Sequence, residues 1–188
     1  MLDERRQRLR QVLRDPDEGV RQAAAEALEK LESLQGLEQV LSALKTGSRG
    51  VRVRALFALE HIRSPEVFPP LLAALKSSDA DLRATAIQVL GSKKEPKTIG
   101  ALVKHLKDPA PAVRVYAAEA LANFSDPRLV PYLAALLDES DTTLVIAAVQ
   151  SLGSIGAAEA ESSLLSLLAD GRPAIRRAAV VALGQLRL

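Results

Sequence analysis

A 31-residue repeat runs through the chain and constrains its fold more than any other feature. Each unit has an apolar residue near the start of its first helix, alanine four positions later and leucine four positions after that. Spacings of four place these residues on one face of a helix, the first helix of each unit. The apolar residues are Val20, Val51, Leu82, Val113, Leu144 and Ile175, the alanines are Ala24, Ala55, Ala86, Ala117, Ala148 and Ala179, and the leucines are Leu28, Leu59, Leu90, Leu121, Leu152 and Leu183.

A second apolar set predicts a second helix in each full unit. Its members are Val40, Leu71, Leu102, Leu133 and Leu164, followed four residues later by Leu44, Leu75, Leu106, Leu137 and Leu168. Every proline falls between units, between the two helices of a unit, or in or near a first helical turn, where a missing amide hydrogen costs little. Pairs of this length cannot bury their apolar faces alone, so neighbouring pairs must stack.

The repeat therefore predicts an all-α fold, an α-solenoid or superhelix of stacked antiparallel helix pairs. We expect a single domain over residues 1–188. It comprises an amino-terminal half-repeat at 1–14, five full repeats at 15–169 and a carboxyl-terminal half-repeat at 170–188.

The composition offers little material for catalysis. The chain has no cysteine, which excludes disulfides and thiolate zinc sites. His61 and His105 lie in different units and have no paired carboxylate at metal-ligand spacing. Phosphate loops, nucleophile elbows and zinc-protease motifs are absent from the sequence. We therefore predict a chain that is not an enzyme and holds no metal and no cofactor.

Three aligned stretches, DPDEGVRQAAAEALEKL, DPAPAVRVYAAEALANF and DGRPAIRRAAVVALGQL, resemble HEAT repeats of the short, phycobilisome-lyase-like kind. The resemblance covers essentially the whole chain. It implies a curved, armadillo-like superhelix whose second helices line the concave face. Members of this family mostly bind proteins, and some assist chromophore attachment or bind DNA. The pattern encodes packing, so it specifies a fold and not an activity.

The acid that the family carries between units is matched at Asp15, Asp108 and Asp170, with Glu139 as a conservative change, and it is absent at Thr46 and Ser77. The family's arginine is matched at Arg21, Arg52, Arg83, Arg114 and Arg176, whereas Val145 departs from the pattern. We interpret the arginines as a structural ladder that ties each helix start to the preceding loop, in preference to a ligand site.

Charge is unevenly distributed, with a basic excess over residues 46–107 and acidic residues without basic ones over 139–169. Cations at the ends of second helices either complement the helix dipole or form a flank that attracts an acidic protein surface. Small residues line the predicted concave wall, and Tyr132 is its one large amphipathic side chain. The candidate partner-binding residues are Arg14, Lys45, Lys76, Lys104, Lys107 and Tyr132.

The last first-type helix has no second helix after it. Ile175, Ala179, Leu183 and Leu186 are therefore expected to form a partly uncovered apolar stripe. Such a stripe indicates that the chain belongs to a longer array, forms a homodimer through this helix, or packs against a partner.

Three functions fit these observations. The first is a non-enzymatic scaffold or regulatory subunit that binds a protein partner with an acidic surface. The second is an accessory subunit of a chromophore-lyase-type enzyme. The third, a nucleic-acid-binding solenoid, fits less well because net charge is only +2 and aromatic residues make up 3%. The charged amino terminus and the short uncharged runs favour a cytoplasmic protein without a membrane span.

Overall fold

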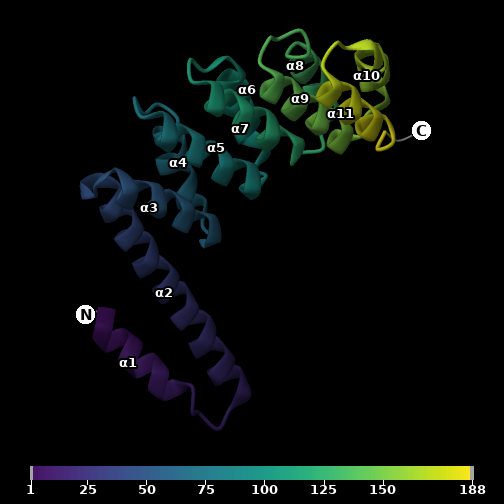
Figure 1. Cartoon of the computed structure of the whole chain (residues 1–188). Helices are drawn as coiled ribbons and strands as arrows, with labels where there is room; N and C mark the ends of the chain where they lie inside the picture. The colour runs from purple at the N-terminus through teal and green to yellow at the C-terminus, as the bar shows by residue number, and fades with distance from the viewer. Residues whose placement is uncertain (1, 187–188) are drawn as a thin grey trace. The chain divides into compact units, whose positions relative to one another are not determined.

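The structure, a computed structural model, describes residues 2–186 and is built of helices joined by short turns (Figure 1). The α-helices are α1 (Leu2–Val12), α2 (Glu18–Thr46), α3 (Arg49–His61), α4 (Phe68–Ala74), α5 (Ala80–Lys93), α6 (Ile99–Lys104), α7 (Pro111–Ala122), α8 (Val130–Ala134), α9 (Thr142–Ile155), α10 (Glu161–Ser166) and α11 (Pro173–Leu183). Single 3-10 turns are η1 (Pro65–Val67), η2 (Pro96–Thr98), η3 (His105–Lys107), η4 (Pro127–Leu129), η5 (Ala158–Ala160) and η6 (Leu167–Ala169). The predicted all-α fold is confirmed.

Phe68–Leu188 forms the larger of two compact units and shows the repeat in its regular form. The first-type helices α5, α7, α9 and α11 stack directly on one another, and each second-type helix, from α4 to α10, packs against the first-type helix that follows it. Figure 1 shows α6, α8 and α10 along one side of this unit and α7, α9 and α11 along the other. The repeat leucines form its core and are fully buried: Leu90, Leu121, Leu152, Leu102, Leu133 and Leu164.

Local sequence explains where these helices begin and how closely they approach. The Asp79 and Asp141 carboxylates accept hydrogen bonds from backbone N–H groups in the first turns of α5 and α9, which is the usual role of aspartate at a helix start. Proline starts α7 and α11, where its fixed φ suits the first turn. A Cβ on Gly91 would lie 2.7 Å from the Cβ of Ala120, so this contact between α5 and α7 requires glycine.

Met1–Val67 forms the smaller unit. In it, α1 packs along α2, and α3 packs along α2 as well. Ala24, Leu28 and Leu37 are buried on α2, and Arg10 of α1 donates a hydrogen bond of 3.3 Å to Glu32 of α2. The single domain expected over residues 1–188 stays a prediction.

One part of the predicted repeat pattern is wrong. The first full repeat was expected to form two helices, but residues 18–46 form the single continuous helix α2. Later repeats separate their helices with Pro65, Pro96 or Pro127, or with Gly156 in the left-handed conformation at φ 69°. The equivalent stretch EKLESLQGLEQ at 29–39 consists of strong helix formers with one glycine, so nothing in it stops the helix.

The arginine ladder is confirmed at several repeats. In each case a guanidinium Nη1 donates to the backbone carbonyl six residues earlier, in the loop between units. The pairs are Arg21 to Asp15 at 2.8 Å, Arg83 to Ser77 at 2.8 Å, Arg114 to Asp108 at 3.2 Å and Arg176 to Asp170 at 2.6 Å. These arginines hold loops in place, as we interpreted them from the sequence.

Arg83 and Asp108 add a buried ion pair to this ladder. The Nε and Nη2 of Arg83 donate to the two carboxylate oxygens of Asp108 at 2.8 and 2.7 Å, and the side chains are 12% and 5% exposed. Burial alone would raise the pKa of Asp108. Hydrogen bonds from Arg83 and from the Ala110 N–H, with the charges of Arg83 and His105, outweigh burial and lower that pKa.

Candidate functional site

A groove runs between the second-type helices of two neighbouring repeats in the carboxyl-terminal unit. It has a volume of about 790 Å³. The α6–η3 segment contributes one wall and α8 with the turn after it contributes the other. The lining residues are Val103, Lys104, Leu106, Lys107, Arg114, Pro131, Tyr132, Ala135, Leu136 and Glu139. The groove thus has an apolar floor, which includes Leu106 and Leu136, beside a basic edge formed by Lys104 and Lys107.

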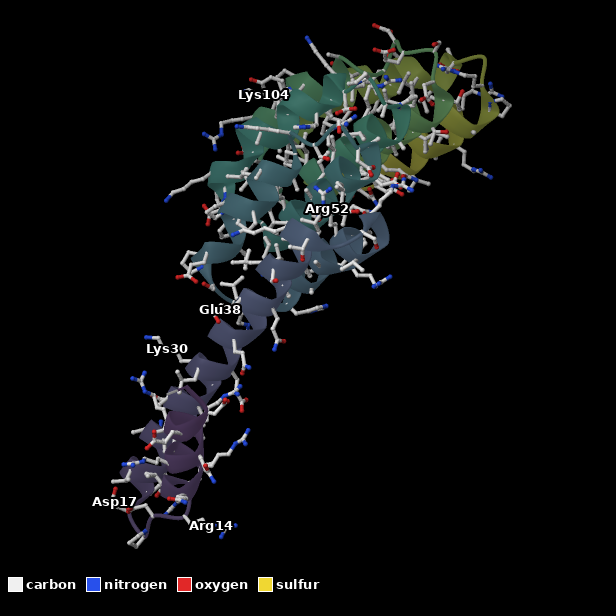
Figure 2. All side chains as sticks on the ribbon, turned by 90° about the vertical axis from the view of Figure 1, so that its left-hand side faces the viewer. Arg14, Asp17, Lys30, Glu38, Arg52 and Lys104 are labelled. Atoms are coloured by element: carbon white, nitrogen blue, oxygen red, sulfur yellow. The ribbon has the colours of Figure 1, made fainter. Side chains whose placement is uncertain are left out.

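Short helices position the polar members of the groove. Lys104 ends α6 and Lys107 ends η3, so both ammonium groups extend from the carboxyl ends of helical turns, where the backbone is partly negative. Figure 2 shows Lys104 on the surface of its unit. Tyr132 projects from α8 and is 52% exposed, while Leu133 next to it is buried in the core. Tyr132 lines the groove, so its ring lies on the groove side of α8.

The electrostatics of the groove favour an anionic ligand. Lys104 and Lys107 are exposed, and neither has an ion-pair partner among the residues that the structure describes. The guanidinium of Arg114 already has partners within the chain, because it donates a hydrogen bond to the Asp108 carbonyl and lies 4.0 Å from a carboxylate oxygen of Asp141. Glu139 is the acidic residue of the lining and stands on the far wall. Two free ammonium groups therefore dominate one edge.

The structure brings together three of the residues predicted to bind a partner, namely Lys104, Lys107 and Tyr132. Lys76 follows α4 in the same unit and does not line the groove. Arg14 and Lys45 belong to the smaller unit: Figure 2 shows Arg14 at the turn between α1 and α2, and Lys45 lies in the last turn of α2. A basic row through Arg14, Lys45, Lys76 and Lys107 stays a prediction.

The apolar stripe predicted on the last helix needs correction. Ile175 and Ala179 are 0% exposed because α11 packs them against α9 and the preceding second-type helix, so they are not available on the surface. Leu183 and Leu186 are half-buried. The strongly exposed apolar residues of α11 are Val180 at 60% and Val181 at 56%. A homodimer through this helix stays a prediction, and it would involve a different face.

The side chain of His105 makes contacts within the fold. The ring nitrogens of His105 lie 2.8 Å from the Ala101 carbonyl and 3.1 Å from the Leu75 carbonyl, so this side chain ties η3 to the preceding second-type segment. Residues 2–186 contain no cluster of three or more histidines and acidic residues that could hold a metal ion. None of the helices in the same range has both the length and the apolar character needed to cross a membrane.

Sequence reasoning missed the apolar floor and Arg114 as groove residues. Leu106 was assigned to the core, Leu136 was given no role, and Arg114 was assigned wholly to the ladder. The available signal was the repeat itself, because residues 31 apart on successive second helices face the same side. Lys104 and Ala135, which both line the groove, could therefore have been paired across it. A further hollow, of about 510 Å³, lies between α9 and α11, but Arg177 is its one charged lining residue.

Comparison with protein families supports the repeat assignment. The model for HEAT repeats matches residues 37–110, 68–153 and 140–188, which together cover most of the chain. The chain belongs to the HEAT-repeat family. The matched ranges start within α2, and the first part of this HEAT-repeat protein lies before them. No curated protein sequence matches it.

Solved structures support the same fold. The complex of CpcE and CpcF of phycocyanin lyase from Nostoc sp. PCC7120 is similar with a TM-score of 0.69 and 24% identity, over 80% of this chain and 64% of that one. The HEAT-repeat chain therefore spans less than two thirds of that relative. The E. coli protein YIBA_ECOLI has a TM-score of 0.64 and 20% identity, over 97% of this chain and 72% of that one.

A designed armadillo repeat protein in complex with the peptide (KR)4 is also similar. Its TM-score is 0.62 and its identity 20%, over 96% of this chain and 98% of that one. Identities this low establish shared architecture and nothing about ligands. Together with the stacked helices of the larger unit, they show that this HEAT-repeat protein is an α-solenoid.

Proposed function

We propose that this HEAT-repeat protein is a non-enzymatic binding module that holds an acidic segment of a partner protein in the groove between α6–η3 and α8. The observation that carries the proposal is the pairing of an apolar floor with the unpaired ammonium groups of Lys104 and Lys107. An extended peptide can place an apolar side chain on such a floor and carboxylates along its edge.

The chemistry of the groove specifies the sign of the charge that a partner must carry. Lysine ammonium groups attract carboxylates over a range that salt screens, so they speed association and select orientation. Tyr132 offers a large rigid contact with little entropy to lose, as is typical of residues that dominate binding energy. The designed armadillo protein of similar fold holds a basic peptide. The groove of this chain is itself basic and therefore suits an acidic peptide.

The proposal is tested with two labelled peptides that share a central leucine. One carries glutamates on both sides and the other carries lysines. We expect the glutamate peptide to bind the full chain and its affinity to fall as salt rises. Lys104→Glu with Lys107→Glu should weaken binding by about tenfold or more, equivalent to about 1.4 kcal/mol. Tyr132→Ala should weaken it by more than about 1 kcal/mol with little change in salt dependence.

Lys97→Glu provides the matched control, because Lys97 is exposed in the same unit and does not line the groove. Its affinity for the glutamate peptide should stay near that of the unchanged chain. Equal binding of the two peptides, or equal losses in the control and the groove variants, would contradict the proposal. Circular dichroism of each variant confirms that the helices remain folded.

An accessory role beside a lyase is the alternative, and it rests on the similarity in fold to CpcE and CpcF. Both functions use a binding surface and differ in the partner. Capture from native lysate on the unchanged chain and on the Lys104→Glu, Lys107→Glu variant distinguishes them. An enzyme captured only by the unchanged chain would identify the accessory role.

A further inference from the structure

Among the described residues, α3 lacks the closely stacked first-type neighbour that α7, α9 and α11 each have on their preceding side. In later repeats the position equivalent to Ala58 contacts the preceding first-type helix. Ser151 donates a hydrogen bond of 2.9 Å to the Ala118 carbonyl, a Cβ on Gly91 would lie 2.7 Å from the Ala120 Cβ, and one on Gly153 would lie 2.8 Å from the Ala182 Cα. This repeated contact defines how first-type helices stack.

Burial shows that the stacking contact is incomplete at α3. Ala58 is half-buried, whereas its equivalents Ala120, Ser151 and Ala182 are 4%, 2% and 1% exposed. Val51, two turns earlier on the same face, is also half-buried. Its equivalents Val113, Leu144 and Ile175 are 0% exposed. Both positions indicate that the first-type helix of the first repeat, at residues 20–31, does not cover α3 as the repeat requires.

The continuous helix α2 explains the missing contact. At 1.5 Å per residue, residues 20 and 46 are about 39 Å apart along the axis, and α3 folds back over only about 20 Å of it. Residues 20–31 therefore lie beyond the end of α3. They form an arm with α1, which Figure 2 shows at the end marked by Arg14 and Asp17, with Lys30 further along α2. Buried Ala24 and Leu28 and the contact between Arg10 and Glu32 hold the arm together.

The arm carries the surface that would stack on α3, and this surface is exposed. Val20 is 41% exposed and Leu13 of the α1–α2 turn is 38% exposed, whereas Leu75, Leu106 and Leu137, which are equivalent to Leu13, are 4–6% exposed. The repeat pairs residue 29 with residue 58, because the equivalent positions are Gly91 with Ala120, Ala122 with Ser151 and Gly153 with Ala182. The helices α7 and α9 stack with a side chain at both positions, so glycine is not needed at residue 29. The exposed face of the arm and the half-buried face of α3 thus belong to adjacent positions of the repeat, but they do not stack on each other within one chain.

We propose that two copies of this chain exchange their arms, so that the arm of each copy, residues 2–31, stacks on α3 of the other. The arrangement keeps α2 continuous and still provides the stacking that the 31-residue period demands. The two α2 helices cross in opposite directions near residues 32–36, on a two-fold axis. The interface is then self-complementary, and each contact occurs twice. A second copy is the occupant because only it presents the missing first-type helix without breaking α2.

Disulfide trapping tests the exchange directly, because the chain has no cysteine of its own. In the variant Glu29→Cys, Ala58→Cys, stacking would bring the two Cβ atoms within the range of a disulfide. We expect oxidation to double the mass from 20.1 kDa on a non-reducing gel, with a peptide map that joins residues 29 and 58. Gln22→Cys with Ala58→Cys is the control, since residue 22 lies about two turns out of register.

The remaining outcomes overturn the proposal. A disulfide between residues 29 and 58 within one chain would mean that the arm folds back on its own α3. Equal cross-linking of the test pair and the out-of-register pair would indicate random collision. Light scattering on the unchanged chain should give the mass of a dimer at micromolar concentration, and a strict monomer would contradict the exchange.

Position 34 offers a second variant with the opposite effect. Leu34 stands where later repeats have Pro65, Pro96 and Pro127. Leu34→Pro should end the helix there and let the arm close on its own chain, as a hinge does in arm exchange. We expect the mass to fall to that of a monomer with helix content retained. A dimer that persists in Leu34→Pro would contradict the proposal.

Discussion

The two units of this HEAT-repeat protein carry the same repeat and bury it to different degrees. Ile175, near the carboxyl end, is fully buried, and Val20, which occupies the same place in the first repeat, is 41% exposed. The difference does not come from hydrophobicity, because both are aliphatic β-branched residues. It comes from the connection between helices, which turns the chain in the larger unit and continues the helix in α2. In the first repeat the stripe is buried at Ala24 and Leu28 and exposed at Val20, whereas in the last it is buried at both Ile175 and Ala179.

The two units also differ in the polar contacts of equivalent residues. Asp15 and Asp108 occupy equivalent positions, and both backbone carbonyls accept a hydrogen bond from the next arginine of the ladder. Asp108 additionally pairs through its carboxylate with Arg83 of the preceding repeat. The Asp15 carboxylate instead accepts a hydrogen bond from the Asp17 N–H. Stacking in the larger unit therefore adds an ion pair that Asp15 does not form with any described residue.

The largest expected effect compares a core residue of each unit. Leu121→Ala removes a fully buried side chain from the centre of the larger unit, and the cavity should lower its free energy of unfolding by about 2–5 kcal/mol. Val20→Ala removes a side chain that is already 41% exposed, and should cost less than about 1 kcal/mol. Urea denaturation followed by circular dichroism measures both. Equal losses would mean that the two units pack equally well.

An intermediate effect is expected at the equivalent aspartates. Asp108→Asn leaves the buried guanidinium of Arg83 without its ionic partner and should cost about 2 kcal/mol, because charged hydrogen bonds of this kind contribute about 1.5–3 kcal/mol. Asp15→Asn should be nearly neutral, since its carboxylate serves one exposed N–H. Denaturation at neutral pH measures the two variants side by side. A loss at Asp15 as large as that at Asp108 would contradict the difference in pairing.

The same pair predicts the direction of pH dependence. The pKa of Asp108 is lowered in the folded state, so its contribution is fully present above the usual aspartate pKa of about 3.9 and is lost as pH falls through the lowered value. Asp170 behaves in the same sense: hydrogen bonds from Arg172 lower its pKa to about 2. The stability difference between the unchanged chain and Asp108→Asn should therefore shrink as pH falls below about 4. A constant difference would contradict the pairing.

The fold could be predicted from the sequence because the repeat specifies which residues of each helix pack in the core. Alanine and leucine at fixed spacing specify which helix face is buried, and those leucines are the core of the larger unit. It failed at residues 18–46 because periodicity reports which residues would pack and not whether the chain turns between them. The warning was present: position 34 is leucine where three later repeats have proline. Local helix propensity decided the outcome there.

The site was harder to predict than the fold. Lys104, Lys107 and Tyr132 were selected from charge and exposure, and the structure places them around one groove. Arg14 and Lys45 were selected by the same rule and lie in the other unit. Ile175 and Ala179 were expected to be partly uncovered, and they are 0% exposed because α11 packs on α9. Charge and period identify the faces of each helix, whereas depth and neighbourhood depend on how the helices stack.

The smallest expected effect concerns proline itself and isolates the role of the connection. Ala158 occupies the same place in the fifth repeat as Leu34 does in the first, and it starts a 3-10 turn after Ala157, whose φ of −83° and ψ of 131° suit a residue before proline. Ala158→Pro should therefore fit the existing turn and raise the free energy of unfolding by about 0.4–1 kcal/mol, by restricting the unfolded chain. Thermal denaturation measures the gain, and light scattering should show no change in mass. A loss of stability at Ala158 would mean that proline is poorly tolerated at this position generally, and that the continuity of α2 depends on more than the residue at position 34.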